Sequence, residues 1–452
     1  MSTVRSRISR SVLAVIGLPA LLLLVLPGCE ADRVEEAASE PAQDVSVDPA
    51  YEEEIAAIAA RSDVARALEE LDRVQDQSIE DLIWLTEIPA PPFMEEERAE
   101  AFAEMLRDAG ADSVWIDEEG NVLALRRGTE GDRTVALDGH LDTVFPPEVE
   151  IRVEQRGDTL FAPGIGDDTR GLIAVRNVLH AMVVADLRTP DDILFIGTVG
   201  EEGLGDLRGV KHLFSDAGPG IDSWIAVDGG DESRVKVQAV GSHRYRVTYQ
   251  GPGGHSWGAF GMVNPHHALG EAIAAWMPEA DRFTAEATIR TSYNVGRIGG
   301  GTSVNSIPYE SWMEVDMRSL DQTYLQGLDD LFQAAIQEGL EAQNQMRRHG
   351  AALEVDVDMV GDRPAGIVDT DTPLIQRAMA ATRFLGVEPS LGSGSTNSNI
   401  PMSLGVPSTT IGRGGEGGGA HSLDEWWRPV RPELGDKKAL LLLLAEAGLR
   451  GS

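Results

Sequence analysis

The distribution of hydrophobic and polar positions along the chain predicts an α/β protein. Apolar residues follow helical spacing from Ile55 to Leu85, and again over EEERAEAFAEMLRDAG, where Gly110 ends the pattern. Short strand-like runs follow, namely SVWID, NVLALRRG, TVALDGHLDTV and DILFIGTVG, and the helical run RGLIAVRNVLHAMVVA precedes the last of them. Strands that alternate with helices are typical of a layered α/β domain.

The pattern changes near Gly241, where we expect an inserted domain. The segment HRYRVTYQGPGGHS alternates like an antiparallel strand, and a helical run, two alternating runs, a long helix and the strand ALEVDVDMV follow it. This βαββαβ order suits a small ferredoxin-like α+β domain. After about Pro364 the α/β pattern returns. We therefore predict a main domain in two parts, 55–241 and 364–452, with an inserted domain over 242–363.

The N-terminal 28 residues are predicted to be a signal peptide. Three arginines precede the apolar run Val12–Leu26, which is too short for a comfortable bilayer span. Cys29 follows LPG, which resembles a bacterial lipobox, and it is the only cysteine. We expect a lipid anchor at Cys29 and a location on the periplasmic side of a bacterial membrane; the alternative is an ordinary signal peptide with an incidental cysteine. The acidic segment 29–54 is predicted to be a flexible tether.

The charge of the chain excludes one class of partner. With 74 acidic and 38 basic residues, the formal net charge is −36. Such a surface repels nucleic acid. We expect no nucleic-acid partner, and contact with a membrane only through the lipid anchor.

Acidic residues and histidines stand directly after several predicted strands. Sites in open α/β sheets form at the carboxyl ends of strands, so these residues are candidate ligands and catalysts. They are His140 with Asp142 after TVALDG, Glu201 with Glu202 after ILFIGTVG, Asp228 after SWIAV, His421 after the glycine-rich run that follows STTIG, and Asp167 with Asp168 in the loop APGIGDDTRG.

Each of these motifs also has a common structural explanation when it is taken alone. Two adjacent glutamates are typical of an acidic turn, two aspartates before a helix are typical of an N-cap, and a loop histidine is usually solvated. The shared placement at strand ends favours function. Neighbouring side chains of an extended chain point in opposite directions, so Glu201 and Glu202 are expected to have separate roles.

Seven segments resemble, in order, those of the M20 family of metallopeptidases, which includes carboxypeptidases, aminoacylases, deacetylases and tripeptidases. The resemblance runs from about Ser78 to Gly448. It implies a zinc-exopeptidase domain, with a mixed sheet flanked by helices, and an inserted lid or dimerisation domain. The segments are GHLDTV, GIGDDTRG, TVGEEG, AVDGGD, GPGGHSWG, GGTSVNSIP and GGAHSLDEW.

The resemblance implies two zinc ions, with cobalt or manganese as alternative metals, bridged by a carboxylate and a water. Zinc takes histidine nitrogen and carboxylate oxygen, and a catalytic site keeps one position open for water. Two metals about 3.5–4 Å apart lower the pKa of that water and polarise the scissile carbonyl. The implied ligands are His140 and Asp228 for one zinc, Glu202 and His421 for the other, and Asp167 between them.

Three further acidic residues receive roles from the same resemblance. Glu201 would be the general base, because a carboxylate not tied to metal is needed to take a proton and return it to the leaving amine. Asp142 would orient His140 through its second ring nitrogen. Asp168 would support the ligands without binding metal, or cap the following helix.

The inserted domain and two departures from the family pattern concern the substrate. His255 resembles a histidine that stabilises the oxyanion, often in the active site of a partner subunit, so a homodimer is one expected assembly. Asn305 and Arg318 resemble contacts to a substrate carboxylate. Taken alone, His255 would be a turn histidine and Arg318 an exposed strand residue. Many members of the family have a lysine at the position of Arg170 and an aspartate at the position of Asn397, where the change would remove a charge on the expected substrate side.

The sequence therefore predicts a secreted, lipid-anchored metallopeptidase. We expect it to hydrolyse an amide bond of di- or tripeptides with a free carboxylate, because DDTRG and STNSNIP resemble the peptidase T-like branch of the family. The alternative within the family is an N-acyl amino acid deacylase. An alternative of another class is a non-catalytic envelope binding protein. The intact set of candidate ligands argues against this alternative.

Overall fold

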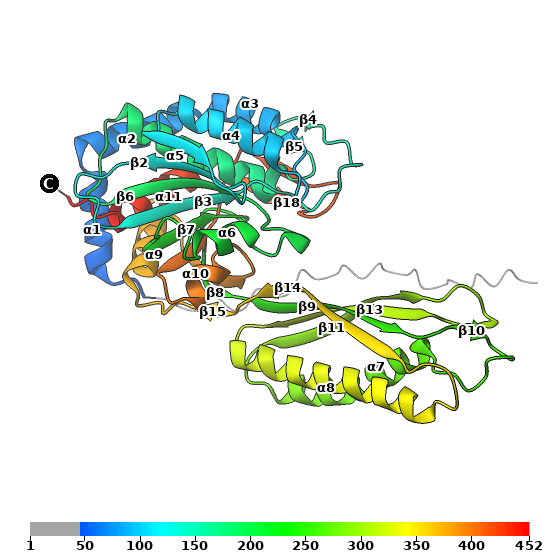
Figure 1. Ribbon diagram of the computed structural model, residues 1–452. Helices are drawn as coiled ribbons and strands as arrows, with labels where there is room; N and C mark the ends of the chain where they lie inside the picture. The colour runs from blue at the N-terminus through cyan, green and yellow to red at the C-terminus, as the bar shows by residue number, and fades with distance from the viewer. Residues whose placement is uncertain (1–45, 452) are drawn as a thin grey trace, which may run out of the picture. The chain divides into compact units, whose positions relative to one another are not determined.

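A computed structural model describes residues 46–451 of the chain (Figure 1). The predicted signal peptide, the predicted lipid anchor at Cys29 and the first part of the predicted tether therefore lie outside the described residues. Within residues 46–451, no helix combines the length and the apolar character that crossing a bilayer requires.

The main domain is built on a nine-stranded mixed sheet with the order β1-β2-β6-β3-β7-β17-β8-β15, in which β16 also pairs with β8. The neighbours β6, β3, β7 and β17 run parallel, so their carboxyl ends meet at one edge of the sheet. The strands are β1 (Ser113–Ile116), β2 (Val122–Arg126), β3 (Thr134–His140), β6 (Asp192–Thr198), β7 (Ser223–Val227), β8 (Arg234–Ala239), β15 (Gly366–Ile367), β16 (Ser390–Gly394) and β17 (Ser408–Ile411).

Helices cover both faces of this sheet. Successive residues of a strand point to opposite faces: Val135 and Leu137 of β3 belong to the larger core, which includes α5 and α11, whereas Ala136 faces the smaller core under α6. The prediction of a mixed sheet flanked by helices is thus confirmed. The helices are α1 (Pro49–Ala59), α2 (Ser62–Arg73), α3 (Gln75–Thr86), α4 (Glu96–Asp108), α5 (Arg170–Val184), α6 (Arg208–Leu213), α9 (Pro373–Phe384), α10 (Asn399–Ser403) and α11 (Glu433–Glu446).

A second, smaller sheet connects two loops of the main domain. Its order is β18-β19-β5-β4, and all of its pairings are antiparallel. The hairpin of β18 and β19 carries the predicted ligand His421 between its strands, and β5 leads into the loop that carries Asp167. The strands are β4 (Glu154–Arg156), β5 (Thr159–Phe161), β18 (Glu416–Gly418) and β19 (Trp426–Arg428).

The inserted segment forms its own antiparallel sheet, with the order β11-β13-β9-β14, and has a core of its own. Two long helices pack together against this sheet (Figure 1), and the chain order is the predicted βαββαβ. A short ribbon of β10 and β12 extends from it. The elements are β9 (Gly241–Gln250), β10 (Gly254–His255), α7 (Pro265–Glu286), β11 (Thr291–Gly300), β12 (Ser306–Ile307), β13 (Glu310–Ser319), α8 (Gln322–Met346) and β14 (Glu354–Arg363).

The prediction of a tether as far as residue 54 is wrong at its end. Helix α1 begins at Pro49, and the Asp48 side chain caps it by accepting a hydrogen bond from the Ala50 N–H. An N-cap aspartate followed by proline at the first helical position is a strong helix start. Reading only the apolar spacing, which starts at Ile55, placed the start of the helix too late. Val47 is already buried.

Candidate metal centre

The predicted ligands converge at the carboxyl ends of the parallel strands. His140 is the last residue of β3, and Glu202 lies four residues beyond the end of β6. The loop between β5 and α5 brings Asp167 to the same place. One atom from each of these three side chains lies within 4.8 Å of one atom from each of the others, a grouping able to hold a metal ion. The predicted convergence at this edge of the sheet is therefore found for these residues.

Asp167 lies between two histidines. Its Oδ1 is 3.1 Å from His140 Nε2, and its Oδ2 is 3.2 Å from His421 Nε2. His421 Nε2 is also 3.0 Å from Glu202 Oε1. Both imidazoles thus direct Nε2 at carboxylate oxygens, and one carboxylate faces both. This donor set, histidine nitrogen and carboxylate oxygen, is the one that zinc takes, and the group of His140, Asp167 and Glu202 is able to hold a metal ion.

Asp228 follows β7 and is half-buried at the same sheet edge. Its N–H donates to the Ile411 carbonyl at 3.0 Å, which ties it to the end of β17. Its side chain is outside the three-residue group, but its charge reaches the site: after burial, Asp228 contributes to the raised pKa of Asp168.

Asp142 supports the site through the main chain as well as through its carboxylate. Its carbonyl oxygen lies 3.0 Å from His140 Nδ1, whereas its Oδ1 lies 3.7 Å from that nitrogen. Its carboxylate accepts the N–H groups of Glu201 at 2.9 Å and Glu202 at 2.7 Å. The buried Asp142 thus fixes the position of His140 relative to Glu201 and Glu202. The sequence predicted only that Asp142 orients His140.

The two adjacent glutamates face different partners, in agreement with separate roles. Glu202 contacts His421, whereas Glu201 Oε1 accepts a hydrogen bond from Arg363 Nη1 at 3.2 Å. Arg363 Nη2 also donates to the Glu201 carbonyl. Burial raises the pKa of Glu201 to about 8, although Arg363 opposes the rise. A carboxyl with a raised pKa, close to the candidate ligands yet not among them, is a candidate general base.

The surrounding carboxylates raise the pKa of both histidines. Burial opposes protonation of His140, but Asp142 and Asp167 raise its pKa well above the usual range. Hydrogen bonds to Asp167 and Glu202 raise the pKa of His421 to about 10. Without a metal ion, protons are therefore held where a divalent cation would bind, since metal ligation requires neutral imidazoles.

Asp168 is fully buried directly behind the ligands. Its Oδ2 accepts the His140 N–H at 3.2 Å, while its Oδ1 has no partner within the described residues. Burial raises the pKa of Asp168 well above its usual range. Gly171 makes room for this carboxylate, because a Cβ at Gly171 would lie 2.2 Å from Asp168 Oδ1. Asp168 thus supports His140 through the main chain.

Three residues near the centre received no role from sequence reasoning. Arg363 contacts Glu201, as described above. Glu425 accepts three main-chain N–H groups from the loop that carries Asp167. Arg413 is 7% exposed, and a Cβ at Gly166 would lie 2.5 Å from its Nη2. The segment GGAHSLDEW contained a signal for Glu425, an acidic residue four positions after His421.

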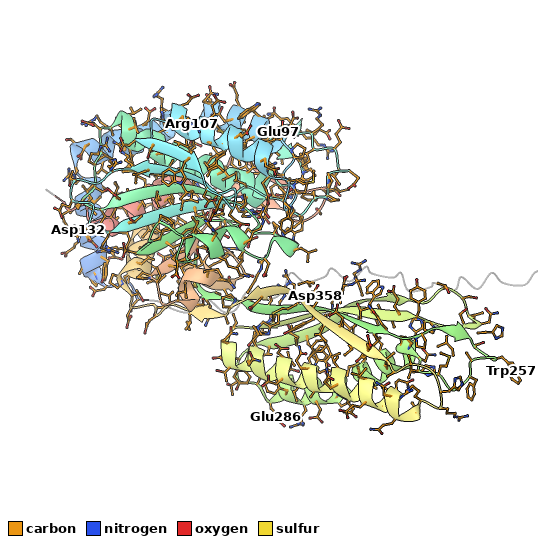
Figure 2. All side chains as sticks on the ribbon, in the orientation of Figure 1. Glu97, Arg107, Asp132, Trp257, Glu286 and Asp358 are labelled. Carbon is orange, nitrogen blue, oxygen red and sulfur yellow. The ribbon has the colours of Figure 1, made fainter. Side chains whose placement is uncertain are left out.

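The predicted substrate residues of the inserted domain lie on exposed surface. His255 and Asn305 come together on the β10–β12 ribbon, where the Ser256 N–H donates to the Asn305 carbonyl at 2.9 Å. His255 Nδ1 accepts the N–H groups of Trp257 and Gly258, which leaves Nε2 as the donor nitrogen of the neutral ring. Figure 2 labels Trp257 at the end of this ribbon. Within residues 46–451, no contact joins the ribbon to His140, Asp167 or Glu202.

Arg318, Asn397 and Arg170 all have protein partners. Arg318 Nε donates to Asp316 at 2.8 Å, and its side chain is 43% exposed. Asn397 is buried and donates to Asp138 and Thr198, so its predicted substrate contact stays a prediction. Arg170 Nη2 donates to Asp436 at 2.7 Å, pointing into the helical layer. The charge of Arg170 is therefore paired with that of Asp436 inside the protein.

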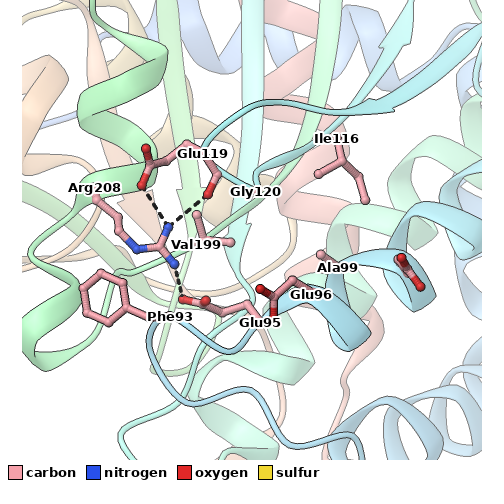
Figure 3. A pocket seen from close by; sticks show the side chains of 10 residues that line it. Phe93, Glu95, Glu96, Ala99, Ile116, Glu119, Gly120, Val199 and Arg208 are labelled. Atoms are coloured by element: carbon pink, nitrogen blue, oxygen red, sulfur yellow. Dashed lines mark hydrogen bonds and ion pairs between the residues drawn. The ribbon is translucent and has the colours of Figure 1, made fainter.

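A pocket of 380 Å³ lies beside the start of α4, and its lining includes Val199, Arg208 and the side chains of Glu95 and Glu119 (Figure 3). Arg208 lies between Glu95, at 2.6 Å, and Glu119, at 3.1 Å. The Arg208 side chain also packs on Gly200, where a Cβ would lie 2.7 Å from Arg208 Cγ. None of the candidate ligands lines this pocket. Its ion pairs instead hold the turn that precedes Glu201.

The fold and the site define a class of metal-dependent hydrolase. The sequence model of peptidase family M20/M25/M40 matches residues 136–444, and the chain belongs to this family. Relatives include a succinyl-diaminopimelate desuccinylase of Corynebacterium glutamicum, 27% identical over 242 residues, which are 52% of this chain and 64% of that protein. A Pyrococcus abyssi protein named as a LysW-lysine/LysW-ornithine hydrolase is 34% identical over 139 residues, which are 31% of this chain and only 37% of that protein.

Solved structures share the fold. The aminopeptidase PepT of Bacillus cereus has a TM-score of 0.65 and 20% identity, covering 82% of this chain and 98% of that one. The YXEP protein of Bacillus subtilis, described as a dinuclear metal-binding peptidase of family M20, has a TM-score of 0.59 and 15% identity, covering 83% and 99%. The predicted architecture, a mixed sheet flanked by helices, agrees with both.

Proposed function

We propose that the chain is a two-metal exopeptidase that hydrolyses an amide bond in a short peptide with a free carboxylate. The observation that carries the proposal is the position of Asp167, whose two oxygens face the Nε2 atoms of His140 and His421 at 3.1 and 3.2 Å. His140, Asp228 and Asp167 would hold one cation, and Glu202, His421 and Asp167 the other, with zinc as the expected metal. When bound, the ions would activate water and polarise the scissile carbonyl.

Glu201 is the proposed general base. It adjoins Glu202 in sequence but faces Arg363, so it remains available to take a proton from water and to return it to the leaving nitrogen. Asp142 fixes the base by accepting its N–H, and it fixes Glu202 in the same way. The hydrogen bonds to Asp142 therefore hold the base and a ligand at a constant separation.

Glu201→Gln tests this assignment. The variant keeps the size of the side chain but cannot accept the proton, so turnover should fall by about 10²–10⁴-fold while two equivalents of metal are retained. Glu202→Gln is the matched control and should lose metal. If Glu201→Gln loses metal and Glu202→Gln loses only rate, the two roles have been exchanged.

Di- and tripeptides are the proposed substrates, on the resemblance of the DDTRG and STNSNIP segments to the peptidase T-like branch. N-acyl amino acids are the second candidate, favoured by relatives named as a succinyl-diaminopimelate desuccinylase and an acetylornithine deacetylase. A screen of di- and tripeptides against N-acetyl and N-succinyl amino acids separates the two. A kcat/KM at least tenfold higher for the acylated amino acids would overturn the first choice.

We also propose secretion to the cell envelope with lipidation of Cys29. The support is the lipobox-like LPGC after a short apolar run. Metabolic labelling with a radioactive fatty acid should label the wild type and not Cys29→Ala, and the variant should leave the membrane fraction. An unlabelled wild-type protein would contradict the proposed anchor without affecting the proposed chemistry.

A further inference from the structure

Glu425 is a buried carboxylate on the hairpin that also carries His421. Its exposed fraction is 2%. One oxygen, Oε2, accepts the Gly164 N–H at 2.8 Å, while Oε1 accepts the N–H groups of Gly166 at 2.8 Å and Asp167 at 2.9 Å. The carboxylate therefore holds three main-chain donors of the loop that contains the proposed shared ligand.

The main chain of Glu425 joins the same two loops. Its carbonyl accepts the Ala162 N–H at 3.0 Å, which extends the pairing of β19 with β5 toward the Asp167 loop. On its other side, the Glu425 N–H donates to the Ser422 carbonyl at 3.2 Å, in the turn that follows His421. Glu425 thus connects the backbone of one proposed ligand to the backbone of the other.

The two halves of the proposed metal centre differ in their dependence on this connection. His140 is the last residue of a central strand, which pairs with β6 as far as His140 itself and with β7 as far as Asp138. His421 lies in a hairpin loop, its side chain is 56% exposed, and its backbone is left-handed with φ 64°. Only the hairpin half therefore needs an additional restraint to keep its spacing from Asp167.

We propose that Glu425 is a positioning residue that fixes the spacing between Asp167 and His421 and thereby controls binding of the second metal ion, the one assigned to Glu202 and His421. This inference rests on the proposed two-metal function. A carboxylate suits the task because its two oxygens can accept all three main-chain N–H groups. Burial raises the pKa of Glu425 to about 7, and these N–H groups oppose the rise.

Glu425→Gln is the direct test, with Asp424→Asn as the matched control. The glutamine oxygen can replace one carboxylate oxygen, but its NH₂ group would then face an N–H donor. Asp424 is exposed in the same loop, so its variant removes the same charge without the hydrogen bonds. Metal-free protein is titrated with Zn²⁺ against a competing chelator, and the binding of Co²⁺ is followed by its visible absorption spectrum.

Wild type and Asp424→Asn should bind two ions. In Glu425→Gln the second ion should bind about 10–100-fold more weakly, the range typical of residues that support ligands, while the first binds within about threefold of wild type. Equal weakening of both ions, or no weakening, would overturn the inference and leave the two-metal proposal intact. A wild type that binds fewer than two ions would overturn the two-metal proposal itself.

A second variant keeps the inference testable if Glu425→Gln does not fold. A Cβ at Gly166 would lie 3.1 Å from Glu425 Oε1 and 2.5 Å from Arg413 Nη2. Gly166→Ala should therefore displace the Arg413 guanidinium and shift the Glu425 carboxylate slightly while Glu425 itself remains, and it should weaken the second ion selectively. Normal binding of both ions by a folded Gly166→Ala variant would contradict the proposed role of the Glu425 contacts.

Discussion

The cluster at the sheet edge, formed by His140, Asp167, Glu202 and His421, and the β10–β12 ribbon each contain a histidine, and the two histidines differ in burial and in hydrogen bonding. In the cluster, His140 is 2% exposed and both of its ring nitrogens face protein oxygens. On the ribbon, His255 is exposed, and its Nδ1 accepts two N–H groups of its own turn. The main domain thus fixes its candidate ligands before any metal binds, whereas the ribbon presents a donor nitrogen that faces no acceptor among residues 46–451.

We propose that this difference separates metal binding from substrate contact. Burial in a low-dielectric environment strengthens interactions between fixed charges. The candidate metal ligands, which must be held in place before the ion binds, are therefore in the buried cluster. The exposed residues of the ribbon are instead proposed to contact the bound substrate. If this division holds, substitutions in the cluster should change metal content, and substitutions on the ribbon should change kinetics alone.

The largest effect is expected for Asp167→Ala. Removing the carboxylate that faces both histidines should abolish binding of at least one ion and lower kcat/KM by about 10⁴-fold or more, because the groups of a metal centre act as a unit. Metal analysis of the purified variant and steady-state kinetics check this result. Retention of two ions with activity within tenfold of wild type would refute the assignment of Asp167 as the shared ligand.

His255→Ala should have the next largest effect. Loss of an oxyanion donor typically lowers kcat by about 10²–10³-fold, and metal content should stay at the wild-type level because His255 has no contact with the cluster. His267→Ala, an exposed histidine on α7, is the control and should be neutral. A His255→Ala variant with normal kcat would place the ribbon outside the reaction.

Metal affinity should rise with pH. The pKa of His421 is raised to about 10 in the metal-free protein by its hydrogen bonds to Asp167 and Glu202, so below that pH a metal ion must displace a proton. One displaced proton corresponds to about a tenfold change in affinity per pH unit. Calorimetry in two buffers of different ionisation enthalpy measures the released protons, and a pH-independent affinity would contradict this account of His421.

The raised pKa of His421 should also make the stability of the metal-free protein fall as the pH rises, opposite to the metal affinity. A histidine whose pKa is higher in the folded state stabilises it fully below the unfolded value of 6.5, and this contribution is lost as the pH rises toward 10. The metal-free form should therefore lose stability over this range, as thermal unfolding would show. His421→Asn should flatten this dependence.

The mixed sheet flanked by helices and the convergence of His140 with Glu202 could be predicted because both motifs follow strands with a clear buried pattern. Asp167 lies in a loop, and its place beside them was predicted from the family resemblance. Glu425 and Arg363 could not be assigned in this way. Their roles depend on pairing between segments far apart in the sequence, β19 with β5 and the end of β14 with the Glu201 turn. The start of α1 was misplaced because the Asp48 cap is a polar signal, which apolar spacing does not register.

Arg318→Ala should have the smallest effect and should fall on KM. The Arg318 guanidinium is partly exposed and already donates to Asp316 through Nε, so a substrate carboxylate could take only its terminal nitrogens. One exposed charged contact is worth about 1–1.5 kcal/mol, or roughly tenfold in KM. The KM of a peptide with a free carboxylate should rise, and that of the amidated peptide should not change. Equal losses for both peptides would show that Arg318 acts on the structure of the inserted domain, and the division between metal binding and substrate contact would then rest on His255 alone.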